Sequence, residues 1–261
     1  MNWTEAASLS QHCLAEVLKE TARRCGGKTL EEPKLLLVSG THPCPIFVNS
    51  ALRIGHVDAE EALSRAAAFF AERGYGYEFW VREGTDDDIE KAAARLGMRF
   101  AAELRGMVLT EIPEEPQSVA GVEVRRVEDI QVFQDFRDVV AEGFQEEAPG
   151  CSDLVRSIFH APATLLAGDT AAFVLYDRGS PASASLTMLK DGIAWIGWVA
   201  TRQKFRGCGL GRLATIAAAR AGFRLGASFA SLEATRMGVP VYSRLGFREV
   251  LRYRNYWPAT M

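Results

Sequence analysis

The stretch that decides the fold reads Val199-Ala-Thr-Arg-Gln-Lys-Phe-Arg-Gly-Cys-Gly-Leu-Gly-Arg212. An apolar, strand-like run over 193–200 leads into it, and an alanine-rich run of helical character begins near its end. Its three glycines let the backbone approach a ligand closely, and the unpaired amides of a helix's first turn favour an anion. The loop and the first turn contain four basic residues and no acidic residue. The stretch therefore predicts a strand, an anion-binding loop and a helix N-terminus that suit a polyanionic cofactor.

Composition and charge are those of a globular protein with one or two domains. The 261 residues are 48% hydrophobic and 24% charged, which allows a substantial core. A net charge of -3 without a basic tail or stripe argues against nucleic acid as a partner. Apolar runs stay well below the roughly 20 residues that span a bilayer, and the charged, helix-like segment 1–25 is unlike a signal peptide. We expect a cytoplasmic protein without a membrane partner; a homodimer stays open.

The cysteines and histidines predict reduced thiols and no metal site. The five cysteines (13, 25, 44, 151 and 208) are scattered and contain no Cys-x-x-Cys pair, and the four histidines lack metal-ligand spacing. Cys208 lies inside the glycine loop, beside a helix N-terminus and two arginines, which favours a reactive thiolate. The simpler interpretation is that a small residue is tolerated there. Modification of the Cys208 thiol that blocks cofactor binding is the alternative hypothesis.

A polar, proline-containing linker at 113–121 divides the chain into halves at 1–112 and 122–261. Hydrophobic periodicity predicts helices at 1–25, 59–73, 87–96, 130–144, 210–225 and 239–245. It predicts strands at 35–38, 46–52, 77–81, 100–109, 122–127, 170–176, 182–190, 193–201, 228–235 and 249–256. Each half is therefore predicted to be an α/β (α+β) unit with helices flanking a mixed sheet.

A short repeat relates the two halves. Arg95-Leu-Gly-Met-Arg99 matches Arg244-Leu-Gly-Phe-Arg248, and each follows a helix-like run and precedes a strand-like one. In the first half the region that corresponds to the glycine loop, 53–61, contains one glycine and three acidic residues. The sequence therefore indicates a duplication in which only the second half keeps the anion loop.

Two elements accompany the loop at fitting distances: Val199-Ala-Thr201 before it and Val241-Tyr-Ser-Arg-Leu-Gly-Phe247 after it. The loop itself, Arg206-Gly-Cys-Gly-Leu-Gly211, fits a Q/R-x-x-G-x-G/A signature, whereas it lacks the Gly-x-Gly-x-x-Gly order of dinucleotide folds and the Gly-Lys-Ser/Thr of a P-loop. With these elements, residues 122–257 resemble the GCN5-related N-acetyltransferase (GNAT) superfamily. The first half resembles a degenerate copy, as in tandem members.

The resemblance implies that acetyl-CoA is the acyl donor and lies where two central parallel strands, 193–201 and 228–235, splay apart. Backbone groups of Val199, Ala200 and Thr201 would hold the pantetheine arm, and an amide near Val199 would stabilise the charge that develops on the thioester oxygen. The amides expected to hold the pyrophosphate belong to Arg206, Gly207, Cys208, Gly209, Leu210, Gly211 and Arg212.

The resemblance also assigns the proton donor. Tyr242 matches the position that protonates the departing sulfur, and a tyrosine phenol, whose ordinary pKa is about 10, stays protonated at neutral pH. Simple packing of its ring in the core is the alternative. The repeat places Ala93 at the corresponding position of the first half. One catalytic site is therefore expected, with the first half as a wall that shapes the acceptor pocket.

The base that takes the proton of the amine stays open at this point. Run 193–200 contains no acid, so Glu233 on the neighbouring strand and Glu142, Glu146 and Glu147 at a helix end are the candidates. A solvated face explains the helix-end cluster as well, and a salt bridge would explain Glu233.

Trp195 and Trp198 are expected to face opposite sides of the sheet because their spacing is odd. One would line the acceptor pocket and the other would pack under a helix. The leading hypothesis is an N-acetyltransferase that acts on a small-molecule or amino-acid-like amine by direct attack in a ternary complex. A regulatory module that binds acyl-CoA without turnover and an acyltransferase with a non-amine acceptor are the alternatives.

Overall fold

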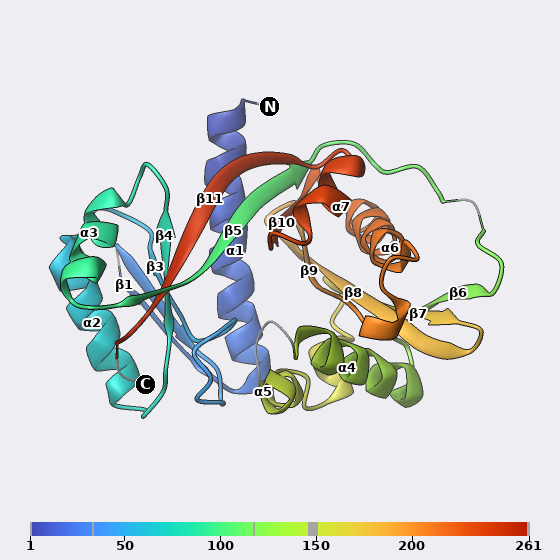
Figure 1. Cartoon of the computed structure of the whole chain (residues 1–261), viewed down its shortest axis with the longest axis horizontal. Helices are drawn as coiled ribbons and strands as arrows, with labels where there is room; N and C mark the ends of the chain where they lie inside the picture. The colour runs from blue at the N-terminus through green and yellow to red at the C-terminus, as the bar shows by residue number, and fades with distance from the viewer. Residues whose placement is uncertain (1, 33, 117, 146–150, 260–261) are drawn as a thin grey trace.

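The computed structural model describes residues 2–32, 34–116, 118–145 and 151–259. These residues form one mixed sheet of eleven strands with helices on both faces (Figure 1), which confirms the predicted α/β class. The base candidates Glu146 and Glu147 lie outside the described residues. Within the described ranges, the helices are too short or too polar to cross a membrane.

The first half contributes the N-terminal helix and the strands at one end of the sheet. Its helices are α1 (Trp3–Cys25), α2 (Ala59–Ala71) and α3 (Asp87–Arg95). Its strands are β1 (Lys28–Glu32), β2 (Leu35–Ser39), β3 (Ser50–Arg53), β4 (Glu78–Arg82) and β5 (Arg99–Leu109). The side chain of Asn2 caps α1 by accepting a hydrogen bond from the Thr4 amide, and Gly26, in the left-handed conformation, ends the helix.

The second half contributes the strands at the other end of the sheet and the glycine loop. Its helices are α4 (Ile130–Phe144), α5 (Cys151–Ile158), α6 (Leu210–Arg224) and α7 (Val239–Arg244). Its strands are β6 (Val122–Arg126), β7 (Thr170–Asp177), β8 (Ser180–Lys190), β9 (Ile193–Thr201), β10 (Phe229–Ala234) and β11 (Arg248–Trp257).

The last strands of the two halves are exchanged in the sheet. The strand order is β1-β2-β3-β4-β11-β5-β10-β9-β8-β7-β6. Strand β11 pairs antiparallel with β4 of the first half, β5 pairs antiparallel with β10 of the second half, and β5 and β11 pair with each other. Figure 1 shows these two long strands running across the middle of the molecule. The segment 113–121 therefore separates the halves in the sequence, while the sheet is continuous through both.

Strands β9 and β10 form the central parallel pair of the second half, and they part as they run. Their ladder holds three pairs, Phe229 with Ile193, Ala230 with Ala194 and Ser231 with Trp195. Beyond these pairs β9 continues to Thr201 and β10 to Ala234. The sheet thus opens between the carboxyl ends of β9 and β10, which is the splay that the family resemblance implies.

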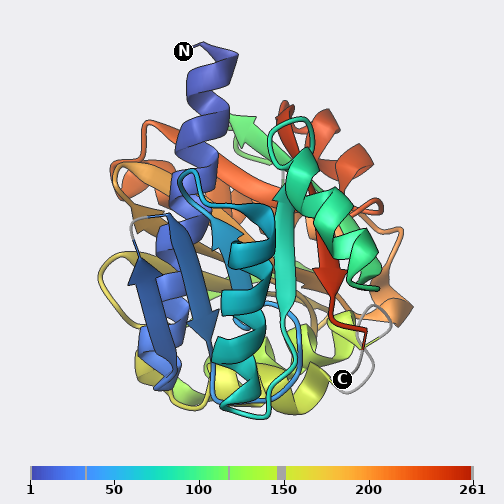
Figure 2. The ribbon, with the colours of Figure 1, turned by 90° about the vertical axis from the view of Figure 1, so that its left-hand side faces the viewer.

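Helix α1 lies across the middle of the sheet and packs on strands of both halves (Figure 1). It shares one hydrophobic core with α4 and α5 on this face. Helices α2 and α3 cover the opposite face of the first-half strands, as Figure 2 shows, and α6 and α7 cover that face in the second half. Alternate residues of β2 belong to different cores, Leu36 to that of α1 and Leu37 to that of α2, as a two-faced strand requires.

Candidate functional site

The glycine loop connects β9 to α6 and has a backbone that only glycine adopts readily. Gly207 and Gly209 have φ values of +79° and +78°, and a Cβ at either position would stand in open space. Gly211 is glycine for another reason, because a Cβ there would lie 3.2 Å from Thr201 Oγ1. The first two glycines therefore set the turn, and the third lets the helix start close to the end of β9.

The start of α6 presents amides without partners. The amide of Leu213 donates to Gly209 O at 3.1 Å, and the amides of residues 207–212 make no backbone hydrogen bond within the described chain. Gly209 has no side chain that could cap the helix. The unpaired amides and the helix dipole together make this helix end a site for an anion.

The side chain of Arg206 links the glycine loop to the end of β9 and to the end of α4. Its guanidinium donates hydrogen bonds to Thr201 O at 3.1 Å and to Gly143 O, at the end of α4, at 3.2 Å. Its amide donates to Gln203 O at 3.1 Å. Among the residues expected at the pyrophosphate, Arg206 thus shapes the loop, while residues 207–212 present their amides.

A groove of about 440 Å³, the loop groove, runs along the glycine loop between β9 and α7. It gathers most of the residues expected at the cofactor: Val199, Ala200, Thr201, Arg206, Gly207, Gly209, Leu210, Gly211 and Arg212. Its lining includes arginines and no acidic residue among the described residues. Cys208 is exposed and does not line the groove, and its Sγ lies 3.8 Å from Arg206 O.

A β-bulge in β9 brings two tryptophans to the same face. Trp198 and Val199 together oppose Ser185 of β8, and Trp198 has a φ of +54°. The extra residue resets the alternation of the strand, so Trp195 and Trp198 belong to the same core and line the same cavity. The prediction that they face opposite sides of the sheet is therefore wrong.

A cavity of about 280 Å³, the inner cavity, opens beside the loop groove and extends between the halves. The two spaces share Phe144, Val199, Thr235 and Tyr242. The remaining lining comes from α1, from the segment before β3, and from strands β4, β5, β9, β10 and β11. The predicted role of the first half as a wall of this space agrees with that lining.

Aromatic side chains from both halves close one side of the inner cavity. The ring of Phe47, from the first half, lies 4.6 Å from that of Trp198 and 5.4 Å from that of Phe144. Phe47 has a φ of +60°, a strained backbone for a bulky residue, which costs about 1–3 kcal/mol. The surrounding structure therefore holds this ring in place against a local preference.

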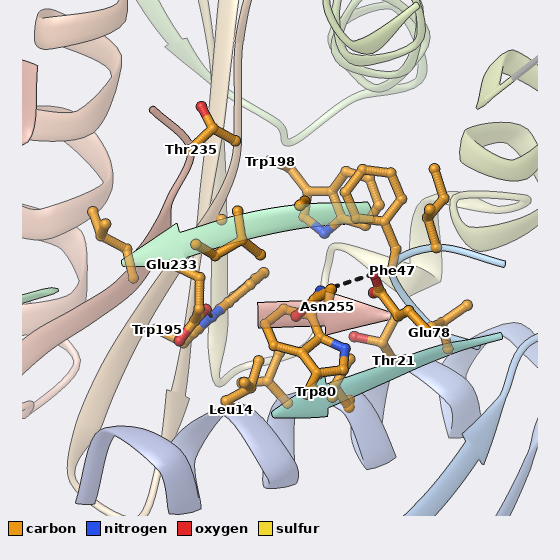
Figure 3. Close-up of a pocket in the computed structure, with 18 of the residues that line it drawn as sticks. Leu14, Thr21, Phe47, Glu78, Trp80, Trp195, Trp198, Glu233, Thr235 and Asn255 are labelled. Carbon is orange, nitrogen blue, oxygen red and sulfur yellow. Dashed lines mark hydrogen bonds between the residues drawn. The ribbon is translucent and has the colours of Figure 1, made fainter. Parts of the chain in front are cut away.

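Glu233 lies in the wall of the inner cavity near the loop groove (Figure 3). The indole nitrogen of Trp195 donates a hydrogen bond to Glu233 Oε2 at 2.7 Å, and the buried Oε1 has no partner among the described residues. Burial raises the pKa of the Glu233 carboxyl to about 7, against the opposing effect of the Trp195 hydrogen bond. A carboxyl with this pKa can take up a proton at neutral pH.

Tyr242 stands at the junction of the loop groove and the inner cavity and lines both. Its ring packs over Gly238, where a Cβ would lie 2.6 Å from Tyr242 Cε2, and it lies 5.9 Å from the ring of Phe247. Core packing and access to the site, which the sequence presents as alternatives, therefore occur together.

Glu142, the helix-end candidate that the structure describes, is exposed at the end of α4. Its carboxylate pairs with the guanidinium of Arg202 at 2.9 Å. Glu142 lines neither the loop groove nor the inner cavity. Its position fits the interpretation as a solvated surface residue.

The structure adds two polar residues that the sequence did not single out, Glu78 at the start of β4 and Asn255 on β11. Asn255 Nδ2 donates a hydrogen bond to Glu78 Oε2 at 2.9 Å, drawn as a dashed line in Figure 3. Ser50 Oγ donates to Glu78 Oε1 at 3.5 Å, and Trp80 Nε1 donates to Ser50 Oγ at 3.0 Å. Burial raises the pKa of Glu78 to about 8. The sequence signal that pointed to Glu78 is an acid directly before the apolar run 79–81.

The corresponding helix start in the first half is already occupied. Asp58 caps α2 by accepting hydrogen bonds from the amides of Glu60 and Glu61, at 2.9 and 3.1 Å. Arg53, at the end of β3, is bound by the carboxylates of Asp86 and Asp88. The carboxylates of Asp58, Glu60 and Glu61 at this helix start disfavour the binding of an anion. In the described part of the chain, the His, Cys, Asp and Glu residues form no group of three that could hold a metal ion.

Comparison with known proteins gives a family match for the second half. The family model of the acetyltransferase (GNAT) domain matches residues 115–234. No curated protein matches the sequence.

Solved structures match over most of the chain. A GCN5-related N-acetyltransferase from Kribbella flavida is 17% identical with a TM-score of 0.73, and the match covers 95% of this chain and 96% of that one. A GCN5-related N-acetyltransferase from Sphaerobacter thermophilus is 18% identical with a TM-score of 0.62, over 80% of this chain and 71% of that one. A tandem GNAT protein from the clavulanic acid biosynthesis pathway is 14% identical with a TM-score of 0.55, over 88% and 78% of the two chains. At these identities the likeness is one of fold.

Proposed function

Because the chain has the fold of the GNAT superfamily and carries an acetyltransferase (GNAT) domain over residues 115–234, we propose that it is an acetyl-CoA-dependent N-acetyltransferase of an amine. One observation carries the proposal. The loop groove and the inner cavity meet at Val199, Thr235 and Tyr242, and the carboxyl of Glu233 lies in the cavity wall near this junction. The donor would occupy the groove and the acceptor the cavity, so that both reach one point.

The residues of the loop groove fit the donor. The unpaired amides of residues 207–212 suit its pyrophosphate, and the arginines of the groove add positive charge. The edge of β9 beyond Trp195, which β10 leaves unpaired, suits the amide-rich pantetheine arm. Acetyl-CoA, when bound, supplies the thioester whose acetyl group is transferred. The bulge at Trp198 and Val199 takes backbone groups out of the regular ladder, as an amide aimed at the thioester oxygen requires, and one such donor contributes about 3 kcal/mol.

The inner cavity fits an amine. Aromatic faces attract a cation, and a carboxylate both binds an ammonium group and accepts its proton. Glu233 would take the proton from the ammonium, the freed nitrogen would then attack the carbonyl carbon, and the carbon–sulfur bond would break. As the amide forms, the nitrogen would lose its second proton to the solvent, and Tyr242 would give its proton to the departing sulfur and recover one from the solvent. Glu233 is thus our choice for the base that the sequence leaves open.

Thiol release from acetyl-CoA with a panel of primary amines tests the proposal. We expect thiol release that depends on the amine, and the amount of thiol released should equal the amount of N-acetylated product. Tyr242→Phe should lower the transfer rate at least about tenfold with acetyl-CoA affinity retained, as loss of a proton donor predicts. Glu233→Gln should do the same, whereas the matched control Glu142→Gln, on the surface, should not.

Calorimetry with acetyl-CoA completes the test. We expect one molecule bound per chain, because Asp58 and two glutamates occupy the corresponding helix start of the first half. One bound acetyl-CoA without thiol release from any amine would favour a regulatory module. Release with alcohols or thiols but not with amines would favour a different acceptor class.

A further inference from the structure

The inner cavity has a second polar end, formed by Glu78 and Asn255. Figure 3 shows these residues on the side of the cavity away from Glu233 and Thr235. Asn255 is 1% exposed and Glu78 is 6% exposed, and both line the cavity. The cavity therefore carries one carboxyl near the loop groove and another at its far end.

The two carboxyl groups are too far apart to bind a single small group. Glu233 lies on β10 and Glu78 on β4, with β5 and β11 between them in the sheet. Three interstrand steps of about 4.8 Å separate the two strands by about 14 Å. An acceptor that reaches both ends must therefore be elongated.

The far end has a buried acceptor atom in need of a donor. Asn255 Oδ1 is buried and has no hydrogen-bond partner among the described residues, although Nδ2 of the same amide is bound to Glu78. Buried polar atoms are rarely left unpaired, because an unpaired buried atom has lost its hydrogen bonds to water without gaining others. A ligand with N–H groups at this position would satisfy Asn255 Oδ1 and contact the adjacent carboxyl of Glu78.

The middle of the cavity is apolar. Leu14, Val17 and Leu18 of α1 cover it from one side, and Ala102 and Leu104 of β5 form part of the floor. The small side chain of Ala102 leaves room on the sheet. A hydrocarbon chain would fill this space without leaving a polar group unpaired.

We propose that the acceptor is an elongated diamine, whose reacting nitrogen lies at Glu233 and whose second ammonium group binds Glu78 and Asn255. This inference rests on the proposed function, because it names the acceptor of the same reaction. Trp80, whose indole lines the same end, offers a ring face to the second cation. The first half thus supplies Glu78 and Trp80, and the exchanged strand β11 supplies Asn255.

Three probes with the same eight-carbon chain test the second group: octylamine, 1,8-diaminooctane and 8-aminooctanoic acid. We expect kcat/KM for the diamine to exceed that for octylamine at least about tenfold, which is about 1.4 kcal/mol of added stabilisation of the transition state. The amino acid should be the poorest, because its carboxylate carries no N–H group and would leave the buried acceptor Asn255 Oδ1 without a donor. The amino acid also tests the alternative most directly. The buried indole nitrogen of Trp257 likewise has no partner in the described chain, and it could donate a hydrogen bond to a carboxylate.

Variants of the far end show which residues read the second group. Glu78→Gln and Asn255→Ala should each bring the diamine-to-octylamine ratio to within about threefold, and calorimetry without acetyl-CoA should show weaker diamine binding. The control Glu60→Gln, on the exposed face of α2, should keep the wild-type ratio. Denaturant unfolding of each variant verifies that it is folded.

The outcomes separate the two proposals. Equal kcat/KM for octylamine and the diamine in the wild type, or a preference for the amino acid, would overturn the diamine inference and leave the acetyltransferase intact. A ratio unchanged in both folded variants would overturn the roles of Glu78 and Asn255. Absence of thiol release with every amine would instead count against the proposed function.

Discussion

Replacing Trp195 by phenylalanine tests how the protein sets the pKa of Glu233. The indole nitrogen donates the one hydrogen bond that the Glu233 side chain receives from another described side chain, at 2.7 Å. This bond favours the ionised carboxylate and therefore lowers its pKa, while burial raises it to about 7. Phenylalanine keeps an aromatic ring at the position but has no N–H group. The substitution should therefore raise the pKa of Glu233 further.

The size of the shift follows from the strength of the lost bond. A hydrogen bond to a charged group contributes about 1.5–3 kcal/mol, and 1.36 kcal/mol corresponds to one pKa unit. The pKa should thus rise by about 1–2 units, to about 8–9. At pH 7 the ionised fraction would fall from about one half to about 1–10%, so kcat/KM should fall about 5- to 50-fold.

The assay is the pH dependence of kcat/KM for acetyl transfer between pH 5.5 and 9.5. The wild type should show an ascending limb near pH 7, because the base must be ionised to accept a proton. Trp195→Phe should move this limb upward and recover most of its activity near pH 9. Glu233→Gln should lose the limb, and the matched control Trp198→Phe, in the same cavity, should leave it in place.

An unchanged limb in folded Trp195→Phe would refute the reasoning. Either the limb would belong to another group, or the indole hydrogen bond would not act on the base. Titration of the carboxyl by infrared difference spectroscopy separates these outcomes, because it reports the ionisation of Glu233 without turnover.

Three further predictions test the backbone and the buried acids. A Cβ on Gly197 would lie 1.9 Å from Trp195 Cη2, so Gly197→Ala should displace the indole and lower the free energy of unfolding by about 1–3 kcal/mol. The ascending limb of its pH profile should shift upward as in Trp195→Phe, and a limb still near pH 7 would contradict this. Glu78 has a pKa raised from 4.5 to about 8, so the folded protein holds this proton more tightly and its stability should fall as the pH rises from about 4.5 to 8. The free energy of unfolding of Glu78→Gln in urea, relative to the wild type, should therefore be a few kcal/mol higher at pH 9 than at pH 5, since each pKa unit corresponds to about 1.4 kcal/mol. The same difference between variant and wild type at both pH values would argue against a buried titrating acid. Gly209 has a φ of +78°, so Gly209→Ala should lower the melting temperature by a few degrees, from a strain of about 1–2 kcal/mol, and weaken acetyl-CoA binding, whereas Gly168→Ala, in open space without a positive φ, should do neither.

Most strands and helices of the second half could be predicted because their periodicity is strong, whereas the short helix α5 (Cys151–Ile158) was missed. Strand 193–201 and helix 130–144 match β9 and α4 residue for residue. The errors have local causes. Strand β1 was missed because Lys28–Glu32 is an exposed, charged edge strand without an apolar run, and β3 starts at Ser50 instead of 46 because Phe47 has a positive φ.

Long-range features were beyond the sequence pattern. Strands β5 and β11 carry similar patterns, so nothing local decides that each completes the sheet of the other half. The bulge at Trp198 left no signal either, and it reversed the expected faces of the two tryptophans.

The candidate site was predictable where it is contiguous in the chain. The glycine loop is such a stretch, and its residues line one groove in the structure. Glu233 was identified because an acid inside an apolar strand is unusual. Glu78 and Asn255 were missed because they are 177 residues apart in the sequence. They meet because the strand exchange places β11 beside β4.

The most direct test of the account is a crystal structure of the chain with CoA and 1,8-diaminooctane, which cannot react without the acetyl group. We predict that the pyrophosphate lies on the amides of residues 207–212, that one nitrogen of the diamine lies within hydrogen-bond distance of Glu233, and that the other lies against Glu78 and Asn255. CoA outside the loop groove, or the amine outside the inner cavity, would contradict the central claim that the donor and the acceptor meet at Val199, Thr235 and Tyr242.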